Sequence, residues 1–240
     1  GGLHVLDPRT GQVSRYPLRP GGPGSASNAV QSVLAGSGGS IWVGFWSGGL
    51  CRIDTRGGRV RFYHPPAGRR SPMSDNIWRV LDVGGGELLV ATNDGAFLFD
   101  ERLESYVPLG DRYPGAGLGS VSAAALDAEG GLWLAHPTGV EHVDRRRGTV
   151  TRFEGGIHGG GAFEGSFVDA LLVDARGHLW VGTERGLSCL DSAGRRLATY
   201  GESDGLPNPN VASITEDASG NVWVGTSGGL ARLRGAVAAP

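Results

Sequence analysis

The sequence predicts an all-β protein, a β-propeller built of four-stranded antiparallel blades. A glycine-led phrase recurs along the chain, clearly as GNVWVGTSGGLARL at 220–233 and more loosely as GHLWVGTERGLSCL at 177–190. Segments beside each copy alternate apolar and polar residues at the spacing of strands, not helices. Successive anchor glycines are 47, 46, 44, 47 and 43 residues apart, which is the length of a four-stranded blade. The anchors are Gly2, Gly49, Gly95, Gly139, Gly186 and Gly229.

The elements of each period follow in the same order. A first strand such as VDALLVD (168–174) leads into a tight, glycine-containing turn, where glycine supplies the positive φ that short hairpins need. A second strand such as LWVGT follows, the third begins at the anchor glycine, and the fourth is more polar, as in TVTRFE (149–154). We therefore predict one domain over 1–240 with five blades, at about 29–64, 77–108, 121–154, 168–201 and 211–234.

The ends of the chain predict how the ring closes. The chain opens with a third strand at 2–7 and a fourth at 12–18, and it finishes on a third strand at 229–234. Because closure removes exposed sheet edges, we expect the closing strands, 1–18, to complete the last blade through residues 12–18. The alternative is an excerpt of a larger ring, with an open edge that can pair with another chain.

Two columns of the repeat have a structural interpretation. A large apolar side chain recurs in the second strand, where it can wedge between neighbouring blades, and a glycine two residues later marks a close approach of the next sheet. The tryptophans are Trp42, Trp133, Trp180 and Trp223, with Leu89 in the remaining copy, and the glycines are Gly44, Gly182 and Gly225.

Composition excludes several classes of function. The 22 basic and 24 acidic residues nearly balance, so the chain lacks the charge that nucleic-acid binding requires. No apolar run approaches the ~20 residues of a membrane helix, and we expect no membrane contact within the chain. Cys51 and Cys189 are expected to be buried thiols, and we predict no metal and no cofactor. The chain has no signal peptide and does not begin with Met, so we expect the address and anchor to lie outside it.

The repeat resembles the two-component regulator propeller repeat. The pattern V-x-S-I-x-x-D-x-x-G-x-x-W-V-G-T-x-x-G-L is nearly whole at 211–230 and almost as clear at 168–187. It weakens at 77–96, where Leu89 replaces tryptophan, and at 121–140. Members of that family typically form the extracytoplasmic sensor part of bacterial hybrid histidine kinases. The resemblance implies a periplasmic or extracellular location and the sensing of a small-molecule or glycan ligand, often a carbohydrate, although the family's rings usually have seven blades.

The first group of candidate ligand-binding residues stands at the start of the first strands. Arg79 interrupts a column of small residues, Trp78 stands beside it, and Asp169 is the only acid in the preceding column. An Arg79–Asp169 ion pair or side chains in water would account for them. The alternative is a polar cluster that binds a ligand carboxylate, phosphate or hydroxyl.

Other candidates lie in loops. Trp46 and His136 depart from the usual second-to-third strand turn, and an exposed Trp46 can stack on a sugar ring. His158 lies in the glycine-rich connection EGGIHGGGAFEGS at 154–166, which is either a lid or a spacer. These loops emerge where propellers usually hold ligands.

The sequence favours a non-catalytic sensor, with no catalytic residue assigned. A protein-interaction ring that self-associates through an open blade edge is the second hypothesis. The third is an enzyme related to the streptogramin lyase propellers, for which His136, His158 and Glu164 are the available candidates.

Overall fold

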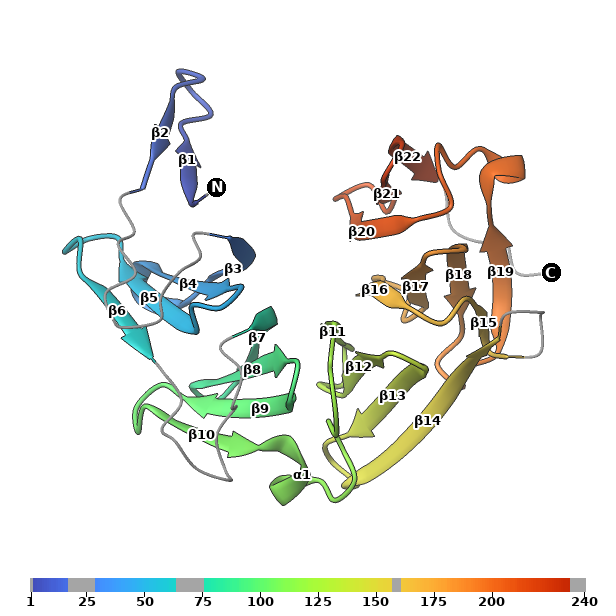
Figure 1. The fold of residues 1–240 in the computed structure, drawn as a ribbon, viewed down its shortest axis with the longest axis horizontal. Helices are drawn as coiled ribbons and strands as arrows, with labels where there is room; N and C mark the ends of the chain where they lie inside the picture. Colours follow the sequence, from blue (N-terminus) through green and yellow to red (C-terminus); the bar gives the residue numbers. More distant parts are fainter. Residues whose placement is uncertain (1, 17–28, 64–75, 157–160, 234–240) are drawn as a thin grey trace. The chain divides into compact units, whose positions relative to one another are not determined.

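The chain folds as an all-β, five-bladed β-propeller of small antiparallel sheets with almost no helix, as predicted (Figure 1). The computed structural model describes residues 2–16, 29–63, 76–156 and 161–233. These divide into two compact units, 1–109 and 110–240, which are described separately below.

The first unit contains blades 1 and 2, each a four-stranded sheet in which strands adjacent in sequence are hydrogen-bonded neighbours. Blade 1 is β3 (Val30–Ala35), β4 (Ser40–Phe45), β5 (Leu50–Asp54) and β6 (Val60–Tyr63), with the short helix η1 (Ser37–Gly39) in its first turn. Blade 2 is β7 (Ile77–Gly84), β8 (Glu87–Thr92), β9 (Gly95–Asp100) and β10 (Ser105–Pro108).

The second unit contains blades 3, 4 and 5 in the same antiparallel order, and a helical turn, α1 (Leu109–Arg112), spans the boundary between the units. Blade 3 is β11 (Ala123–Leu126), β12 (Leu132–His136), β13 (Gly139–Asp144) and β14 (Thr149–Gly156), to which β15 (Phe163–Glu164) adds in parallel. Blade 4 is β16 (Val168–Val173), β17 (Leu179–Thr183), β18 (Gly186–Leu190) and β19 (Arg196–Tyr200). The helix η2 (Glu202–Asp204) precedes blade 5, which is β20 (Val211–Glu216), β21 (Val222–Thr226) and β22 (Gly229–Leu233).

The first strands pair with each other. β1 (His4–Leu6) and β2 (Val13–Arg15) form a two-stranded antiparallel sheet in the first unit. Completion of blade 5 by residues 12–18 stays a prediction, because blade 5 belongs to the second unit. A local turn explains the pairing, because Asp7 Oδ1 accepts the backbone N–H groups of Arg9 and Thr10 and folds the chain back. Among the described strands, blade 5 has three.

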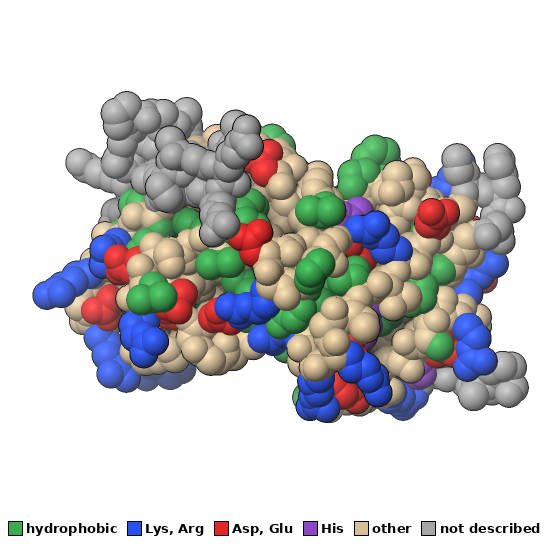
Figure 2. All heavy atoms as spheres, turned by 90° about the horizontal axis from the view of Figure 1, so that it is seen from below, with side chains coloured by type: hydrophobic (Ala, Val, Ile, Leu, Met, Phe, Trp, Pro, Cys, Tyr) green, Lys and Arg blue, Asp and Glu red, His purple; other side chains and the backbone are tan. Residues whose placement is uncertain are grey.

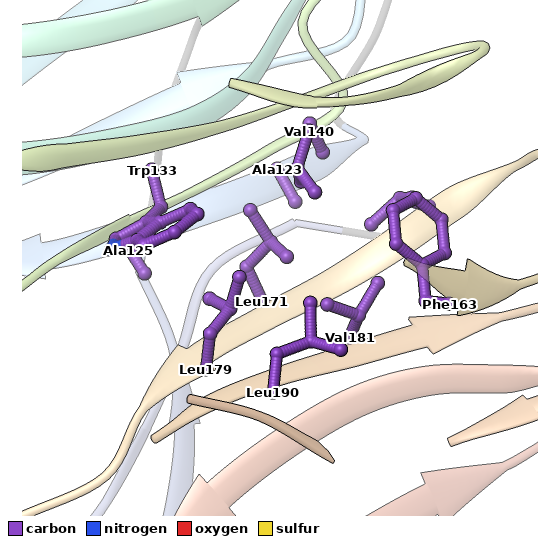
Figure 3. Close-up of a cluster of buried hydrophobic side chains, with 11 residues drawn as sticks. Ala123, Ala125, Trp133, Val140, Phe163, Leu171, Leu179, Val181 and Leu190 are labelled. Atoms are coloured by element: carbon purple, nitrogen blue, oxygen red, sulfur yellow. The ribbon is translucent and has the colours of Figure 1, made fainter. Parts of the chain in front are cut away.

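The core lies between consecutive sheets. Figure 3 shows Trp133 and Ala125 of blade 3 facing Leu171 and Leu179 of blade 4. Phe163, from the glycine-rich connection, is fully buried in the same cluster, so part of that connection is anchored by an aromatic side chain. Three of the four repeat tryptophans are buried and the one in blade 5 is half-buried; the buried three are Trp42, Trp133 and Trp180.

The glycines that follow the tryptophans differ in what lies above them. A Cβ at Gly44 would lie 2.6 Å from Cγ2 of Ile77 in blade 2, and one at Gly182 would lie 2.5 Å from Cγ1 of Val211 in blade 5. These two glycines therefore permit the close approach of the next sheet. Gly225 instead faces the hydroxyl of Ser213 in its own sheet.

A carboxylate at the end of the first strand holds the tryptophan of the same blade. The indole N–H of Trp180 donates to Asp174 at 2.9 Å, and that of Trp223 donates to Asp217 at 2.8 Å. In blade 1 the corresponding residue is Gly36, and the buried Nε1 of Trp42 has no acceptor among the described residues. Sequence comparison among the copies missed this pairing of aspartate with tryptophan.

Acid is expected to weaken this contact in blade 5. Hydrogen bonds from Trp223 and Asn221 hold the pKa of Asp217 well below its usual 3.8. A carboxyl whose pKa is lowered by folding contributes stability above the unfolded-state pKa and loses it as pH falls toward the folded-state pKa. The free energy of unfolding should therefore fall below about pH 4, and Asp217→Asn should make that decline shallower.

Urea unfolding of the two proteins at a series of pH values measures this slope. Glu129→Gln, on the exposed turn of blade 3, is the control and should leave the slope as in the wild-type protein. An equal decline in Asp217→Asn and the wild-type protein would show that Asp217 does not contribute.

Candidate ligand-binding site

The column that contains Trp78 and Asp169 is a column of β-bulges. In four of the five first strands the register shifts by one residue against the second strand, so that one residue has no opposite partner. A bulge turns the extra side chain away from the regular alternation of the strand. The extra residues are Gln31, Trp78, Asp169 and Ala212.

The bulge in blade 2 brings two tryptophans together. Trp46, in the β4–β5 turn of blade 1, and Trp78 have ring centroids 4.9 Å apart and planes at 77°, an edge-to-face pair. Trp46 remains 38% exposed, whereas Trp78 is half-buried. The pair therefore offers an exposed indole that is supported from behind by a second one.

Two asparagines fix this aromatic pair. The indole N–H of Trp78 donates to Oδ1 of Asn93 at 2.6 Å, which ties it to the β8–β9 turn. Oδ1 of Asn76 accepts the backbone N–H of Ser47 at 2.8 Å and its hydroxyl at 3.0 Å. Ser47 has a left-handed backbone with φ of 56°, a conformation that such bonds help to maintain. The turn that carries Trp46 is thus bonded to the start of the next blade.

Arg79 follows the bulged tryptophan. Its side chain makes no hydrogen bond or ion pair with any other residue that the structure describes, and partial desolvation lowers the pKa of its guanidinium. Its side chain is exposed. A guanidinium whose N–H groups have no protein acceptor can bind carboxylate, phosphate or hydroxyl oxygens.

Asp169 has an acidic neighbourhood in the second unit. Burial, and then the charge of Glu184, raise the pKa of Asp169. Glu184 itself accepts the backbone N–H groups of Ser166 and Phe167, so it is fixed in the β17–β18 turn. Asp169 and Arg79 belong to different units.

His136 lies beside a fully buried carboxylate that sequence reasoning missed. Its Nε2 is 3.3 Å from Oε1 of Glu141, and Glu141 also accepts the backbone N–H of Gly117 and contacts Arg152 Nε at 3.5 Å. Burial works against the charged form, but the contacts with His136 and Gly117 outweigh it and lower the pKa of Glu141. The only available signal was that Glu141 is the single acid in its column of third-strand residues.

The structure thus joins two of the predicted ligand-binding residues, Trp46 and Trp78, and Arg79 directly follows Trp78 in the sequence. Within the described part of the second unit, Asp169 and His136 share no hydrogen bond or ion pair. His158 lies outside the described residues. Among the residues that the structure describes, no group of three or more His, Cys, Asp and Glu is placed to hold a metal ion.

The comparison with protein families agrees with the repeat pattern. Residues 162–185 and 205–228 match the two-component regulator propeller model. The resemblance inferred from the repeat is therefore confirmed over these two segments, which lie in and next to blades 4 and 5. No curated protein sequence matches the chain.

Solved structures share the fold. The extracellular domain of a putative hybrid two-component system from B. thetaiotaomicron matches 100% of this chain, with a TM-score of 0.75 and 21% identity. A second extracellular domain from the same organism, also of a putative hybrid two-component system, matches 99% of it, with a TM-score of 0.75 and 16% identity. Streptogramin B lyase matches 88% of it, with a TM-score of 0.62 and 13% identity.

These matches cover most or all of this chain but a smaller share of the matched structures. The chain covers 31% and 30% of the two extracellular domains, and 69% of the lyase. At these identities the likeness concerns the fold. The described residues also contain no helix of the length and apolarity that crossing a membrane takes.

Proposed function

We propose that this propeller is a non-catalytic, ligand-binding part of a two-component sensor that acts outside the cytoplasm, and that Trp46, Trp78 and Arg79 bind its ligand. The proposal is supported by the two-component regulator propeller repeats and by the fold shared with extracellular domains of such systems. The observation that carries it is the exposed Trp46 held edge-to-face against Trp78.

The chemistry of this site suits a carbohydrate. One face of a sugar ring is lined by C–H groups that can lie on an indole, while its hydroxyls need donors and acceptors at the rim. Trp46 supplies the indole and Arg79 supplies up to five N–H donors. Because the bonds to Asn76 and Asn93 already fix the aromatic pair, little conformational freedom is lost when a ligand binds.

A titration of the purified chain with a panel of oligosaccharides, followed by calorimetry, tests the proposal. We expect one or more members to bind saturably without being consumed. Trp46→Ala should weaken that binding about tenfold or more, which corresponds to about 1.4 kcal/mol. Arg79→Gln should weaken it by a similar factor, because it removes guanidinium N–H donors to the ligand.

Leu103→Ala serves as the matched control, because Leu103 is an exposed apolar residue of the same unit, in the β9–β10 turn. It should leave the affinity unchanged. Binding that survives Trp46→Ala would place the ligand elsewhere. Conversion of a panel member to product that is lost on His136→Ala would favour the lyase hypothesis, and concentration-dependent self-association that survives all these changes would favour the interaction ring.

A further inference from the structure

A second surface of the first unit gathers arginines around a groove. The groove has a volume of about 570 Å³ and lies on β5 and β6 of blade 1, with one wall from the β9–β10 turn of blade 2. Figure 2 shows basic and acidic side chains interleaved at the left of the view, on the part of the surface that belongs to the first unit. The charged and aromatic side chains that line the groove are Arg52, Asp54, Arg59, Arg61, Tyr63 and Glu104.

Two of these arginines stand directly opposite each other. Arg52 on β5 and Arg61 on β6 are register partners across the antiparallel pair, and like charges in that position repel. Both are held by aromatic rings: the guanidinium carbon of Arg52 lies 5.6 Å from the ring centre of Trp42, and that of Arg61 lies 5.3 Å from the ring centre of Tyr63. Stacking occupies the flat face of a guanidinium and leaves N–H groups at its edge able to donate.

The carboxylates of the groove leave part of this positive charge uncompensated. Glu104 forms an ion pair with Arg61 and accepts a hydrogen bond from the Tyr63 hydroxyl at 3.4 Å. Asp54 accepts the backbone N–H groups of Arg56 and Gly57 and so caps its own turn. The side chain of Arg59 makes no hydrogen bond or ion pair with another described residue, although its charge acts on Asp54. The groove is therefore lined by three arginines and two carboxylates, and each carboxylate also accepts hydrogen bonds from groups other than these arginines.

Glu104 has a backbone conformation that residues other than glycine rarely adopt. Its backbone φ is 52°, in the left-handed region, and a non-glycine residue there is held by its surroundings. The β9–β10 turn thus positions the Glu104 carboxylate at Arg61, the arginine that a bound anion would also contact. Glu104 would compete with such an anion for Arg61.

We propose that this groove binds the oxyanion of a small ligand, a carboxylate, sulfate or phosphate group, between Arg52, Arg59 and Arg61. An oxyanion there relieves the repulsion between Arg52 and Arg61, gives Arg59 an acceptor, and can receive paired N–H donors from a guanidinium edge. The site lies on the outer strands of blade 1 and shares no residue with Trp46, Trp78 and Arg79.

Titration of the isotopically labelled chain with sodium acetate, sulfate and phosphate, against sodium chloride at matched ionic strength, tests this site. The side-chain Nε–Hε resonances of the arginines, followed by NMR, report which guanidinium groups respond. We expect saturable shifts at Arg52, Arg59 and Arg61 with at least one of the three oxyanions, and the one that binds most tightly identifies the class of ligand group.

Two variants should change the affinity in opposite directions. Arg59→Gln removes a donor and should weaken binding about tenfold, as for a charge-assisted contact. Glu104→Gln removes the competing carboxylate and should tighten binding several-fold. Arg102→Gln, on the exposed turn after β9, is the control and should change nothing. A general loss of structure cannot produce this reversal of sign.

Two outcomes would overturn the proposal. One is a set of shifts that follow ionic strength alike in all four salts, which would indicate screening without a site. The other is an affinity that falls in Glu104→Gln as it does in Arg59→Gln. Oligosaccharide binding at Trp46 is a separate readout, so either site can fail while the other stands.

Discussion

Trp180→Ala is expected to lower the free energy of unfolding of the second unit by about 3–5 kcal/mol, the usual cost of deleting a fully buried tryptophan. Trp180 is 1% exposed and packs in the cluster that joins blades 4 and 5. Its ring centre lies 6.1 Å from that of Tyr200. The substitution also leaves Asp174, itself buried, without the indole N–H that it accepts at 2.9 Å.

Trp223→Ala is the matched comparison, because it removes the same side chain from the same column and breaks the corresponding bond to Asp217. Trp223 is only half-buried, so its loss should cost distinctly less. Guanidinium chloride unfolding of both variants, followed by circular dichroism, measures the difference. Equal losses would mean that the column does not stabilise the protein through burial between sheets.

Gly182→Ala is expected to destabilise the second unit by about 1–3 kcal/mol, the range found when a well-packed core is overfilled. The new Cβ would lie 2.5 Å from Cγ1 and 3.1 Å from Cβ of Val211. These atoms belong to a β-branched side chain on the neighbouring sheet, which cannot rotate out of the way without losing its own packing. Blades 4 and 5 would have to move apart.

Gly225→Ala tests the same substitution at the same repeat position, where the described contact lies within the residue's own sheet. Its new Cβ would meet the hydroxyl of Ser213, which can rotate away, while the Cβ of Ser213 is 3.7 Å distant. This variant should unfold nearly as the wild-type protein does. Thermal melts of the two proteins decide the matter, and the prediction is wrong if Gly225→Ala is the less stable of the pair.

The sequence was sufficient to predict the blades because each copy repeats the same local code. The alternating strands, the glycine turns and the tryptophan column each recur within about forty residues. Five imperfect copies of the same pattern therefore support one prediction of the blade. Closure through residues 12–18 depends instead on pairing between segments distant in sequence. It stays a prediction, because β2 and blade 5 belong to different units.

The candidate sites could be predicted only in part by comparing the copies of the repeat. Trp78 and Asp169 were noticed because they differ from their columns, but the bulge on which each of them lies appears only in the register of the strands. Glu141 was missed because a charged residue on a third strand ordinarily faces water, whereas here it accepts the backbone N–H of Gly117 in a buried setting. Which side chains meet across a turn depends on distances in space, and comparing equivalent positions of the repeat does not give those distances.

The β-bulge has a consequence for how such a protein can change its specificity. The extra residue in β3, β7, β16 and β20 opposes nothing on the neighbouring strand, so the hydrogen-bonded ladder places few demands on its side chain. Gln31, Trp78, Asp169 and Ala212 illustrate that freedom within one chain. Mutation can therefore explore new recognition chemistry at one position in each of these blades while the architecture is inherited unchanged.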